Sequence, residues 1–292
     1  MSKAVFVPVR NEAHNIDHLL SSLIRCVPEM PIYIIMTNPE DGTDKIVSLI
    51  AEYFKNVVPI NLSTRGKVHA INKAFAIARE SGIDWIIFID GDMLPELLSF
   101  RKLVDMKVEK DLGIIGFRLV PLNNMRTLFG FMSYLESNLN HYISLSKFKL
   151  RGSYMINSKI LINVPPLLND DYYVQLMAEE KGYKVRYEQN IKVYYMASTC
   201  LRDWWKQNIR WVMGFMQIRD KYKFKEPVSP LNLVRNYIRS LPYRNFMGLS
   251  YGIACFFMLS AVWLSAYIKF YFVKDHLSCY WESVESSKRL SE

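Results

Sequence analysis

The sequence lacks several short signatures that would assign a function at once. It has no GxGxxG run, which excludes the common dinucleotide-binding fingerprint. Gly66-Lys67 has Asn rather than Gly five residues before Gly66, and this excludes the P-loop pattern. The four cysteines are far apart and form no CxxC pair. Their spacing argues against a zinc knuckle or a disulfide framework and fits a reducing compartment.

A secretory leader is also not expected, because the first apolar run, residues 4–9, is short and contains Pro8. The sequence has fewer acidic than basic residues: 28 Asp and Glu compared with 37 Lys and Arg, which gives a net charge of +9. Such a balance suits an anionic partner, which could be a nucleic acid, a phosphorylated ligand or an anionic membrane surface. Half of the 292 residues are hydrophobic, enough to build a sizeable core.

One long stretch, Phe246–Ile268, has no charged residue. As a helix it would be about 34 Å long, which is enough to cross a hydrocarbon core of about 30 Å. A buried core helix is the alternative, but such helices seldom run this long without a polar face. Basic residues flank the stretch on both sides: Arg235, Arg239, Arg244, Lys269 and Lys274. Their distribution leans toward one span with the N-terminal domain in the cytoplasm.

The first 110 residues alternate between short apolar runs and amphipathic segments. Strands are predicted at 4–9, 32–36, 57–61 and 85–89, and helices at 16–24, 44–54 and 67–80. Asn11 is expected to cap the first of these helices. Alternation at this spacing predicts an α/β fold with a mostly parallel sheet and helices on both faces.

The second part of the chain is less regular. We predict strands at 113–120, 185–187 and 193–196, a strand and turn at 152–161, and helices at 125–147, 172–181 and 202–222. The last helix carries tryptophans together with Lys and Arg, which suits a helix lying at a membrane interface. An ordinary amphipathic helix packed on the domain is the alternative. The expected organisation is a large domain (1–225), a juxtamembrane segment (226–245), a membrane helix (246–268) and a polar tail (269–292).

The strand at 85–89 ends in two acids, Asp90-Gly91-Asp92. A buried parallel strand delivers such residues to the carboxyl edge of the sheet, where α/β proteins bind ligands. Two neighbouring carboxylates repel each other unless a cation lies between them, and hard divalent cations prefer oxygen ligands. A simple Asp-Gly turn at the end of a strand is the alternative.

Six polar motifs follow one another along the chain. They are 8–12, 41–44, 65–67, 90–92, 169–171 and 207–211. Their order and spacing, over about residues 3–215, resemble family 2 of the inverting nucleotide-sugar glycosyltransferases, which have the GT-A fold. The resemblance implies that residues 1–225 form a GT-A domain that binds a nucleotide-sugar donor, expected to be a UDP-sugar.

By this resemblance, the first two motifs hold the nucleoside of the donor. The segment from Pro8 to Glu12 would hold the base and ribose, with Glu12 accepting hydrogen bonds. Either Glu40 or Asp41 would contact the base, because the acidic run here is one residue short of the usual pattern. The structural alternatives are an acid that favours the first turn of a helix, for Glu12, and turn formation, for Asp41.

The next motifs concern the diphosphate and the metal. Arg65 and Lys67 flank a glycine at the start of a helix, and these cations with free backbone N–H groups would bind a diphosphate. Two solvated surface charges are the alternative. The resemblance implies that Asp90 contacts the ribose or the metal, and that Asp92 coordinates Mg²⁺ or Mn²⁺. The metal would neutralise the diphosphate and stabilise the leaving charge.

The last motifs concern the acceptor. Asp171 is the expected general base, which takes the proton of the acceptor hydroxyl, and a helix N-terminus would keep it ionised. Asp170 is expected beside the acceptor, although Asn169 or Asp170 could simply cap the helix. Residues 207–211 match a QxxRW pattern, in which Arg210 would pair with the diphosphate and Trp211 would stack on the acceptor or donor sugar. The family's small-residue turn near the acceptor is matched by Gly152-Ser153, and Gln207 completes the donor-binding set.

We therefore expect a membrane-anchored, metal-dependent inverting glycosyltransferase with a lipid, lipid-linked or glycan acceptor and no nucleic-acid partner. The QxxRW pattern often accompanies processive polysaccharide synthases, which usually have several spans. Since one span is predicted, single transfer is expected and a synthase, monomeric or oligomeric, is the alternative. A non-catalytic nucleotide-sugar-binding membrane protein and a nucleotidyltransferase are further alternatives. The acids at 92 and 171 argue against a non-catalytic binding protein. A nucleotidyltransferase would not explain the QxxRW helix beside a membrane span.

Overall fold

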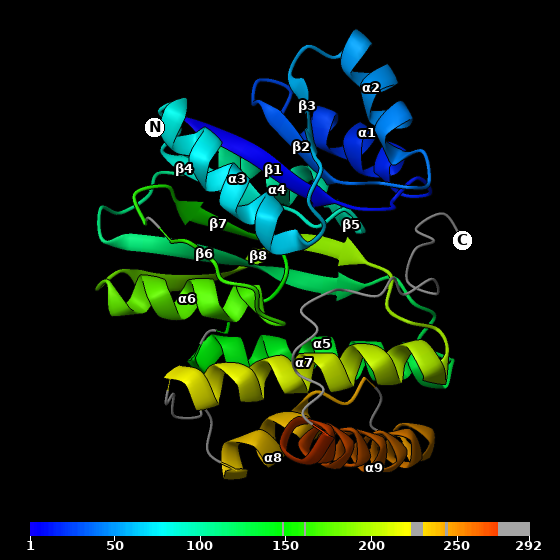
Figure 1. Cartoon of the computed structure of the whole chain (residues 1–292). Coiled ribbons are helices and arrows are strands. Elements are labelled where there is room, and N and C mark those ends of the chain that lie inside the picture. Colours follow the sequence, from blue (N-terminus) through cyan, green and yellow to red (C-terminus); the bar gives the residue numbers. More distant parts are fainter. Residues whose placement is uncertain (148, 161, 223–229, 243–244, 274–292) are drawn as a thin grey trace.

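A sheet of eight strands runs through the part of the chain that the structure describes (Figure 1). The structure is a computed structural model, and it describes residues 1–147, 149–160, 162–222, 230–242 and 245–273. Across the sheet the strands are β3 (Val57–Leu62), β2 (Ile32–Thr37), β1 (Lys3–Val9), β4 (Trp85–Phe88), β7 (Tyr154–Asn157), β6 (Leu112–Pro121), β8 (Lys184–Tyr195) and β5 (Met93–Pro95). β3, β2, β1 and β4 pair in parallel, as do β6 and β8. β7 is antiparallel to both neighbours, and β5 is antiparallel to β8. The predicted mostly parallel sheet is confirmed.

Helices cover both faces of the sheet, because the side chains of each strand alternate between two cores. In β1, Val5 and Val7 enter one core while Ala4 and Phe6 enter the other. The first core is closed by α1 (Ile16–Cys26), α2 (Thr43–Tyr53) and α4 (Leu97–Asp105), and the second by α3 (Lys67–Glu80) and α6 (Asp170–Glu180). This arrangement brings the ends of β1 and β4 and the starts of α3 and α6 to one edge.

A third core lies beyond α6 and is built mainly by helices. α5 (Leu128–Ser146) and α7 (Leu201–Tyr222) form a layer between the sheet and the last helices, α8 (Pro230–Arg239) and α9 (Phe246–Ile268) (Figure 1). α9 continues as a π-helical segment, Lys269–Val273. The bounds predicted for the long apolar helix agree with α9. Within the described residues, Phe246–Val273 is the one helix long and apolar enough to cross a membrane.

α9 contacts the layer of α5 and α7 along its length. The ring of Tyr251 lies 5.4 Å from that of Phe131 on α5, and the ring of Trp263 lies 6.2 Å from that of Phe215 on α7. Farther along, the hydroxyl of Tyr271 lies 3.0 Å from Arg219 Nη2 on α7. The predicted flanking charges Arg244 and Lys274, and residues 274–292 of the predicted tail, lie outside the described residues.

α7, which we predicted as an interfacial helix, packs on the domain with its apolar face. Trp204, Val212 and Met216 are buried in the third core between α5 and α9. α8 instead leaves apolar side chains outside: Leu231 is 83% exposed and Ile238 is 60% exposed. The packing of α7 favours the alternative of an ordinary amphipathic helix, and its placement at a membrane stays a prediction.

Two local predictions are wrong. The strands predicted at 185–187 and 193–196 are one strand, β8, which pairs with β6 through a register shift after Phe117 and Glu188. The polar run after Glu188 resembles a turn but forms an irregularity inside the strand. Asn11 does not cap α1. It has a left-handed backbone (φ 55°), its side chain accepts from the Glu40 N–H, and α1 starts after Asn15.

Candidate active site

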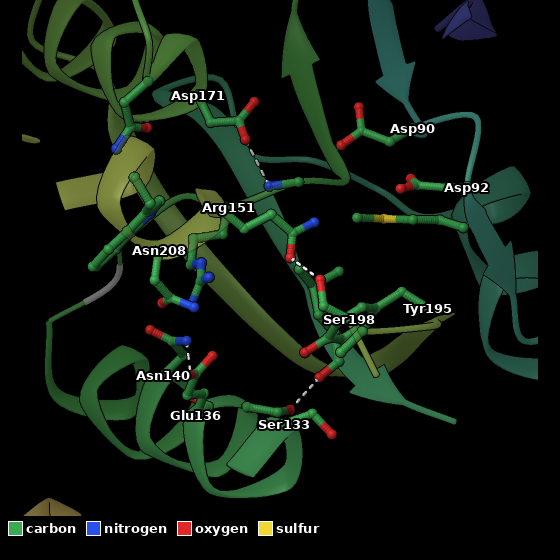
Figure 2. A pocket seen from close by; sticks show the side chains of 18 of the residues that line it. Asp90, Asp92, Ser133, Glu136, Asn140, Arg151, Asp171, Tyr195, Ser198 and Asn208 are labelled. Carbon is green, nitrogen blue, oxygen red and sulfur yellow. Dashed lines mark hydrogen bonds between the residues drawn. The ribbon is translucent and has the colours of Figure 1, made fainter. Parts of the chain in front are cut away.

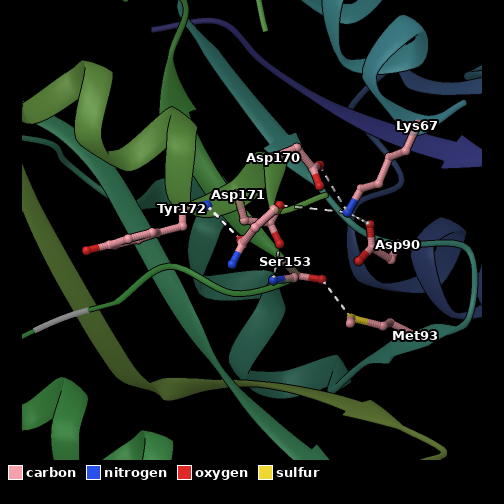
Figure 3. A network of polar contacts seen from close by, with 9 residues as sticks. Lys67, Asp90, Met93, Ser153, Asp170, Asp171 and Tyr172 are labelled. Atoms are coloured by element: carbon pink, nitrogen blue, oxygen red, sulfur yellow. Dashed lines mark hydrogen bonds and ion pairs between the residues drawn. The ribbon is translucent and has the colours of Figure 1, made fainter. Parts of the chain in front are cut away.

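Three carboxylates from two elements gather around one lysine (Figure 3). Asp90 follows β4, while Asp170 and Asp171 form the first turn of α6. Lys67, the first residue of α3, places its Nζ 2.8 Å from Asp90 Oδ1, 3.5 Å from Asp170 Oδ2 and 3.7 Å from Asp171 Oδ1. The DGD segment and the start of α6, which are far apart in the sequence, therefore lie together in the folded chain.

The first turn of α6 combines a helix cap with a positioned acid. Asn169 is the N-cap, and its side chain accepts from the Tyr172 N–H. Asp171 Oδ2 accepts from the Gly152 N–H at 2.7 Å, whereas buried Oδ1 has no hydrogen-bond donor among the described residues. Gly152 has φ 59°, and a Cβ there would come 2.9 Å from Met93 Cε. The left-handed backbone favours glycine here, whereas Met93 Cε is the end of a flexible side chain and could move.

Burial and neighbouring charge shift the ionisation of the site. Burial raises the pKa of Asp171 to about 7, with Asp170 and Asp90 adding to the effect and Lys67 opposing it. Burial, with the charges of Glu12 and Asp90, also raises the pKa of Asp92 to about 7. For Lys67, burial lowers the pKa, but the surrounding acids outweigh it and hold the pKa well above its usual value.

A cavity of about 260 Å³ joins these acids to the space between α5 and α7 (Figure 2). Its lining includes nine of the residues that the sequence singles out: Lys67, Asp90, Asp92, Gly152, Asp170, Asp171, Gln207, Arg210 and Trp211. Asp92 and Asp171, which come from distant parts of the chain, therefore share one cavity.

Five of the singled-out residues do not line this cavity. Glu12 interacts electrostatically with Asp92 and accepts a hydrogen bond from Asn15 at 3.1 Å. Pro8 lies in β1 behind the turn at Gly91, where a Cβ would come 3.6 Å from its carbonyl oxygen. Ser153 is buried and donates to Met93 Sδ at 3.1 Å, beneath the cavity wall.

The other two, Asp41 and Arg65, lie near the start of α2 and α3. Asp41 accepts from the Ala13 N–H at 2.9 Å and the Thr43 N–H at 3.0 Å, so it ties two loops together. Arg65 pairs with the half-exposed Glu40. Both oxygens of Asp41 are engaged by these donors, and both oxygens of Glu40 face cations, since Glu40 Oε2 also lies 3.7 Å from Arg10 Nη2.

The cavity also contains residues that sequence reasoning missed. One side of α5 contributes polar residues at helical spacing: Ser133, Glu136, Ser137, Asn140 and Ser144. That stripe was a readable signal, but it is hidden by the aromatic residues around it. The loop before β7 contributes two cations, with Lys149 Nζ 4.5 Å and Arg151 Cζ 5.0 Å from the centre of the Trp211 ring. Part of the Trp211 surface is thus covered by cations.

The acids at the cavity fit a divalent cation only in part. No group of three or more His, Cys, Asp or Glu side chains arranged to hold a metal occurs among the described residues. Asp90 and Asp92 nevertheless supply hard oxygen ligands, and besides burial the negative charges of Glu12 and Asp90 raise the pKa of Asp92. The remaining ligands would have to come from water and from a bound anionic molecule.

Comparison with solved structures identifies the fold. A mannosyltransferase from Pyrobaculum calidifontis, solved with GDP-Man and Mn²⁺, superposes with a TM-score of 0.65 at 16% identity, covering 94% of this chain and 88% of that one. Glucosyl-3-phosphoglycerate synthase from Mycobacterium tuberculosis, solved with Mn²⁺, UDP and phosphoglyceric acid, superposes with a TM-score of 0.54 at 13% identity. This superposition covers 77% of this chain and 80% of that one. The expected GT-A-like fold is confirmed.

Sequence comparison identifies the family. Poly-beta-1,6-N-acetyl-D-glucosamine synthase of Staphylococcus aureus is 21% identical over 219 residues, which cover 70% of this chain. The chain spans about half the length of the curated relatives it matches, 52% in this case. The profile of the family described as "Glycosyl transferase family 2" matches residues 4–164. The chain belongs to glycosyl transferase family 2.

Proposed function

We propose that this protein transfers a sugar from a nucleoside-diphosphate donor to an acceptor hydroxyl by single displacement, with inversion at the anomeric carbon. The observation that carries the proposal is the shared cavity of Asp92 and Asp171, in which Lys67 lies between Asp90 and the first turn of α6. This displacement needs groups that hold the diphosphate and a separate base for the acceptor. The acids and the lysine at the sheet edge can serve the first purpose, and Asp171 across the cavity can serve the second.

Asp171 is the proposed general base. Its Oδ2 is held by the Gly152 N–H, which fixes the carboxylate, while Oδ1 is available to take a proton. The acceptor oxygen attacks the anomeric carbon as its proton passes to Oδ1, and the bond to the nucleoside diphosphate breaks with its electron pair. A pKa of about 7 matches this task near neutral pH, because a base is most effective close to its own pKa.

The diphosphate is proposed to bind at the acids and cations on the sheet side of the cavity. Asp92, with Asp90, would hold Mg²⁺ or Mn²⁺, which neutralises the leaving diphosphate when bound. Lys67 and Arg210 line the same cavity and would contact the phosphate oxygens. Glu12, Glu40, Arg65 and the loop after Pro8 surround the expected place of the nucleoside outside the cavity.

A UDP-sugar is the proposed donor. Solved neighbours contain UDP or GDP-Man, so both bases belong in the first experiment. The test is nucleotide release from a panel of UDP- and GDP-sugars by the full chain with Mn²⁺ and mixed acceptors. We expect release with a UDP-sugar that depends on Mn²⁺ and on Asp171. Nucleotide-sugar binding without release, under every acceptor condition, would instead favour a non-catalytic binding protein.

We also propose attachment to a bilayer through the outward face of α9. Phe257 is 66% and Leu264 is 62% exposed on this face. The sequence predicts a single crossing with the domain in the cytoplasm. The contacts from Tyr251 to Tyr271 extend over about 30 Å of helix and favour a helix lying in the membrane plane, because a crossing helix would carry α5 and α7 into the bilayer.

A processive polysaccharide synthase is the second proposal. It is supported by the synthase relative, whose match of 219 residues covers 70% of this chain. Product length separates the two proposals, since single transfer yields one added sugar and a synthase yields a polymer without release between steps.

A further inference from the structure

The part of the cavity between α5 and α7 extends away from the acids that the proposed transfer uses. In Figure 2, Asp90, Asp92 and Asp171 lie at one end, while Ser133, Glu136 and Asn140 of α5 lie at the other. We define this second end as the α5 arm. Neither the metal, the base nor the diphosphate needs it, so its lining calls for another occupant.

The lining of the α5 arm has the chemistry of a carbohydrate site. Hydroxyl and amide groups come from Ser133, Asn140 and Asn208, and aromatic rings from Tyr187 and Trp204. Sugars present many hydroxyl groups beside apolar C–H faces, so they bind where amides and hydroxyls alternate with aromatic rings. Ser133 Oγ and the amide nitrogens of Asn140 and Asn208 donate to backbone carbonyls of their own helices, and the oxygens of these side chains can accept hydrogen bonds from sugar hydroxyl groups.

Glu136 is the charged group of the arm. Its Oε1 accepts from the indole N–H of buried Trp204 at 3.1 Å, which fixes the carboxylate on the wall of the cavity. Burial raises the pKa of Glu136, although Arg151 and the indole N–H oppose the rise. With Oε1 engaged by the indole, the carboxylate can accept hydrogen bonds from sugar hydroxyl groups at Oε2.

The far end of the arm holds a neutral hydrogen-bonding pair. His141 Nδ1 lies 3.0 Å from the Tyr187 hydroxyl, and both residues line the cavity. Burial, with the nearby charges of Arg118 and Arg239, lowers the pKa of His141 to about 4, so the ring is neutral at physiological pH. A neutral imidazole and a phenol can each donate and accept hydrogen bonds, which matches the hydroxyl groups of a sugar.

One loop connects the arm to the proposed base. Gly152 donates to Asp171, and the preceding residue, Arg151, lies over the Trp211 ring and interacts electrostatically with Glu136. A sugar held in the arm would thus be placed relative to Asp171 by two adjacent residues. We propose that the α5 arm binds the glycan part of the acceptor, one or more sugars behind the attacking residue, with Glu136 accepting hydrogen bonds from it.

This inference rests on the proposed glycosyl transfer, but its test is a binding measurement and does not require turnover. Oligosaccharides of one to four units, β-1,6-linked N-acetylglucosamine and mannose series, are titrated into the full chain in detergent by calorimetry. We expect at least one series to bind about 10-fold more tightly when it lengthens from one sugar to two or three. Length-independent binding, or binding of neither series, would overturn the proposal.

Variants of Glu136 test whether this residue causes the gain in affinity with oligosaccharide length. Glu136→Ala should remove the length-dependent gain of about 10-fold, and Glu136→Gln, which keeps the acceptor for Trp204, should remove part of it. The matched control is Glu96→Gln. Like Glu136, Glu96 accepts a hydrogen bond from an aromatic side chain, in this case from the Tyr194 hydroxyl at 2.8 Å, but it lies outside the cavity lining. The control should keep the full gain. If Glu136→Gln, Glu96→Gln and the unaltered protein gain the same affinity as the oligosaccharide lengthens, Glu136 has no role in binding it. The unfolding temperature of each variant identifies any misfolded one.

Discussion

Asp171 is the residue on which the proposed chemistry depends most. Asp171→Asn keeps the shape and the contact with the Gly152 N–H but cannot accept a proton. We expect unchanged donor affinity and a loss of turnover of at least about 100-fold. Calorimetric donor binding and initial rates measure the two quantities. The control Asp17→Asn changes an exposed acid in the first turn of α1 instead, and comparable rates for both variants would remove Asp171 from the mechanism.

The raised pKa of Asp171 predicts a pH dependence. A general base works in its ionised form, so turnover should rise with pH through about 7 and level off above it. Below that pKa, the rate should fall about 10-fold for each pH unit. Rates at saturating donor and acceptor, measured from pH 5.5 to 8.5, provide the check. A flat profile over this range would show that another group limits the reaction or that Asp171 is not the base.

Asp92 is expected to act through donor binding. Asp92→Asn removes charge at the turn after β4, so nucleotide-sugar affinity in Mn²⁺ should fall, while affinity without metal should change little. Titration of the nucleotide-sugar with and without Mn²⁺ measures the metal-dependent and the metal-independent affinity separately. Metal dependence equal to that of the unaltered protein would argue that Asp92 is only part of an Asp-Gly turn.

At the scale of elements, the position of the site depends on a close contact between α7 and the segment before α6. A Cβ on Gly214 would lie 2.9 Å from Asn169 Cβ and 3.0 Å from Leu168 Cβ. Gly214→Ala should therefore shift the start of α6 and cost about 1–3 kcal/mol of unfolding free energy through overpacking, with up to about 1 kcal/mol offset by helix propensity. Denaturant unfolding and turnover should both decline. Lys221→Ala, on the exposed end of α7, is the control, and equal stability of the two variants would contradict the tight contact.

The sequence is informative where one physical signal dominates an element. Lys67–Glu80 and Phe246–Ile268 have the predicted bounds because uninterrupted helical patterns define them. β8 was divided in two because a polar irregularity and a turn have the same composition, and only pairing with β6 distinguishes them. Likewise, the DGD and Asp171 motifs could be found from local chemistry. The polar stripe on α5 could be read from its helical spacing, but the residues that face it from α7 could not, since the two helices become neighbours only on folding.

At the scale of the whole molecule, the exposed apolar faces of α8 and α9 should govern membrane association. The double variant Phe257→Glu/Leu264→Glu introduces charge on side chains that are 66% and 62% exposed, so it should reduce vesicle binding without unfolding the protein. Leu49→Glu, on α2 at 57% exposure, is the matched control and should bind vesicles normally. Flotation with anionic liposomes measures the difference. Undiminished flotation of the double variant would place the attachment elsewhere.

The cavity arrangement allows one direct test of the whole account. In the proposed arrangement Asp171 lies on one side of the acceptor and the diphosphate on the other, so the attacking oxygen would approach opposite the leaving group. The anomeric configuration of the product, determined by proton NMR during transfer from an α-linked nucleotide-sugar, should therefore be β. A product that retains the α configuration would contradict the proposed displacement.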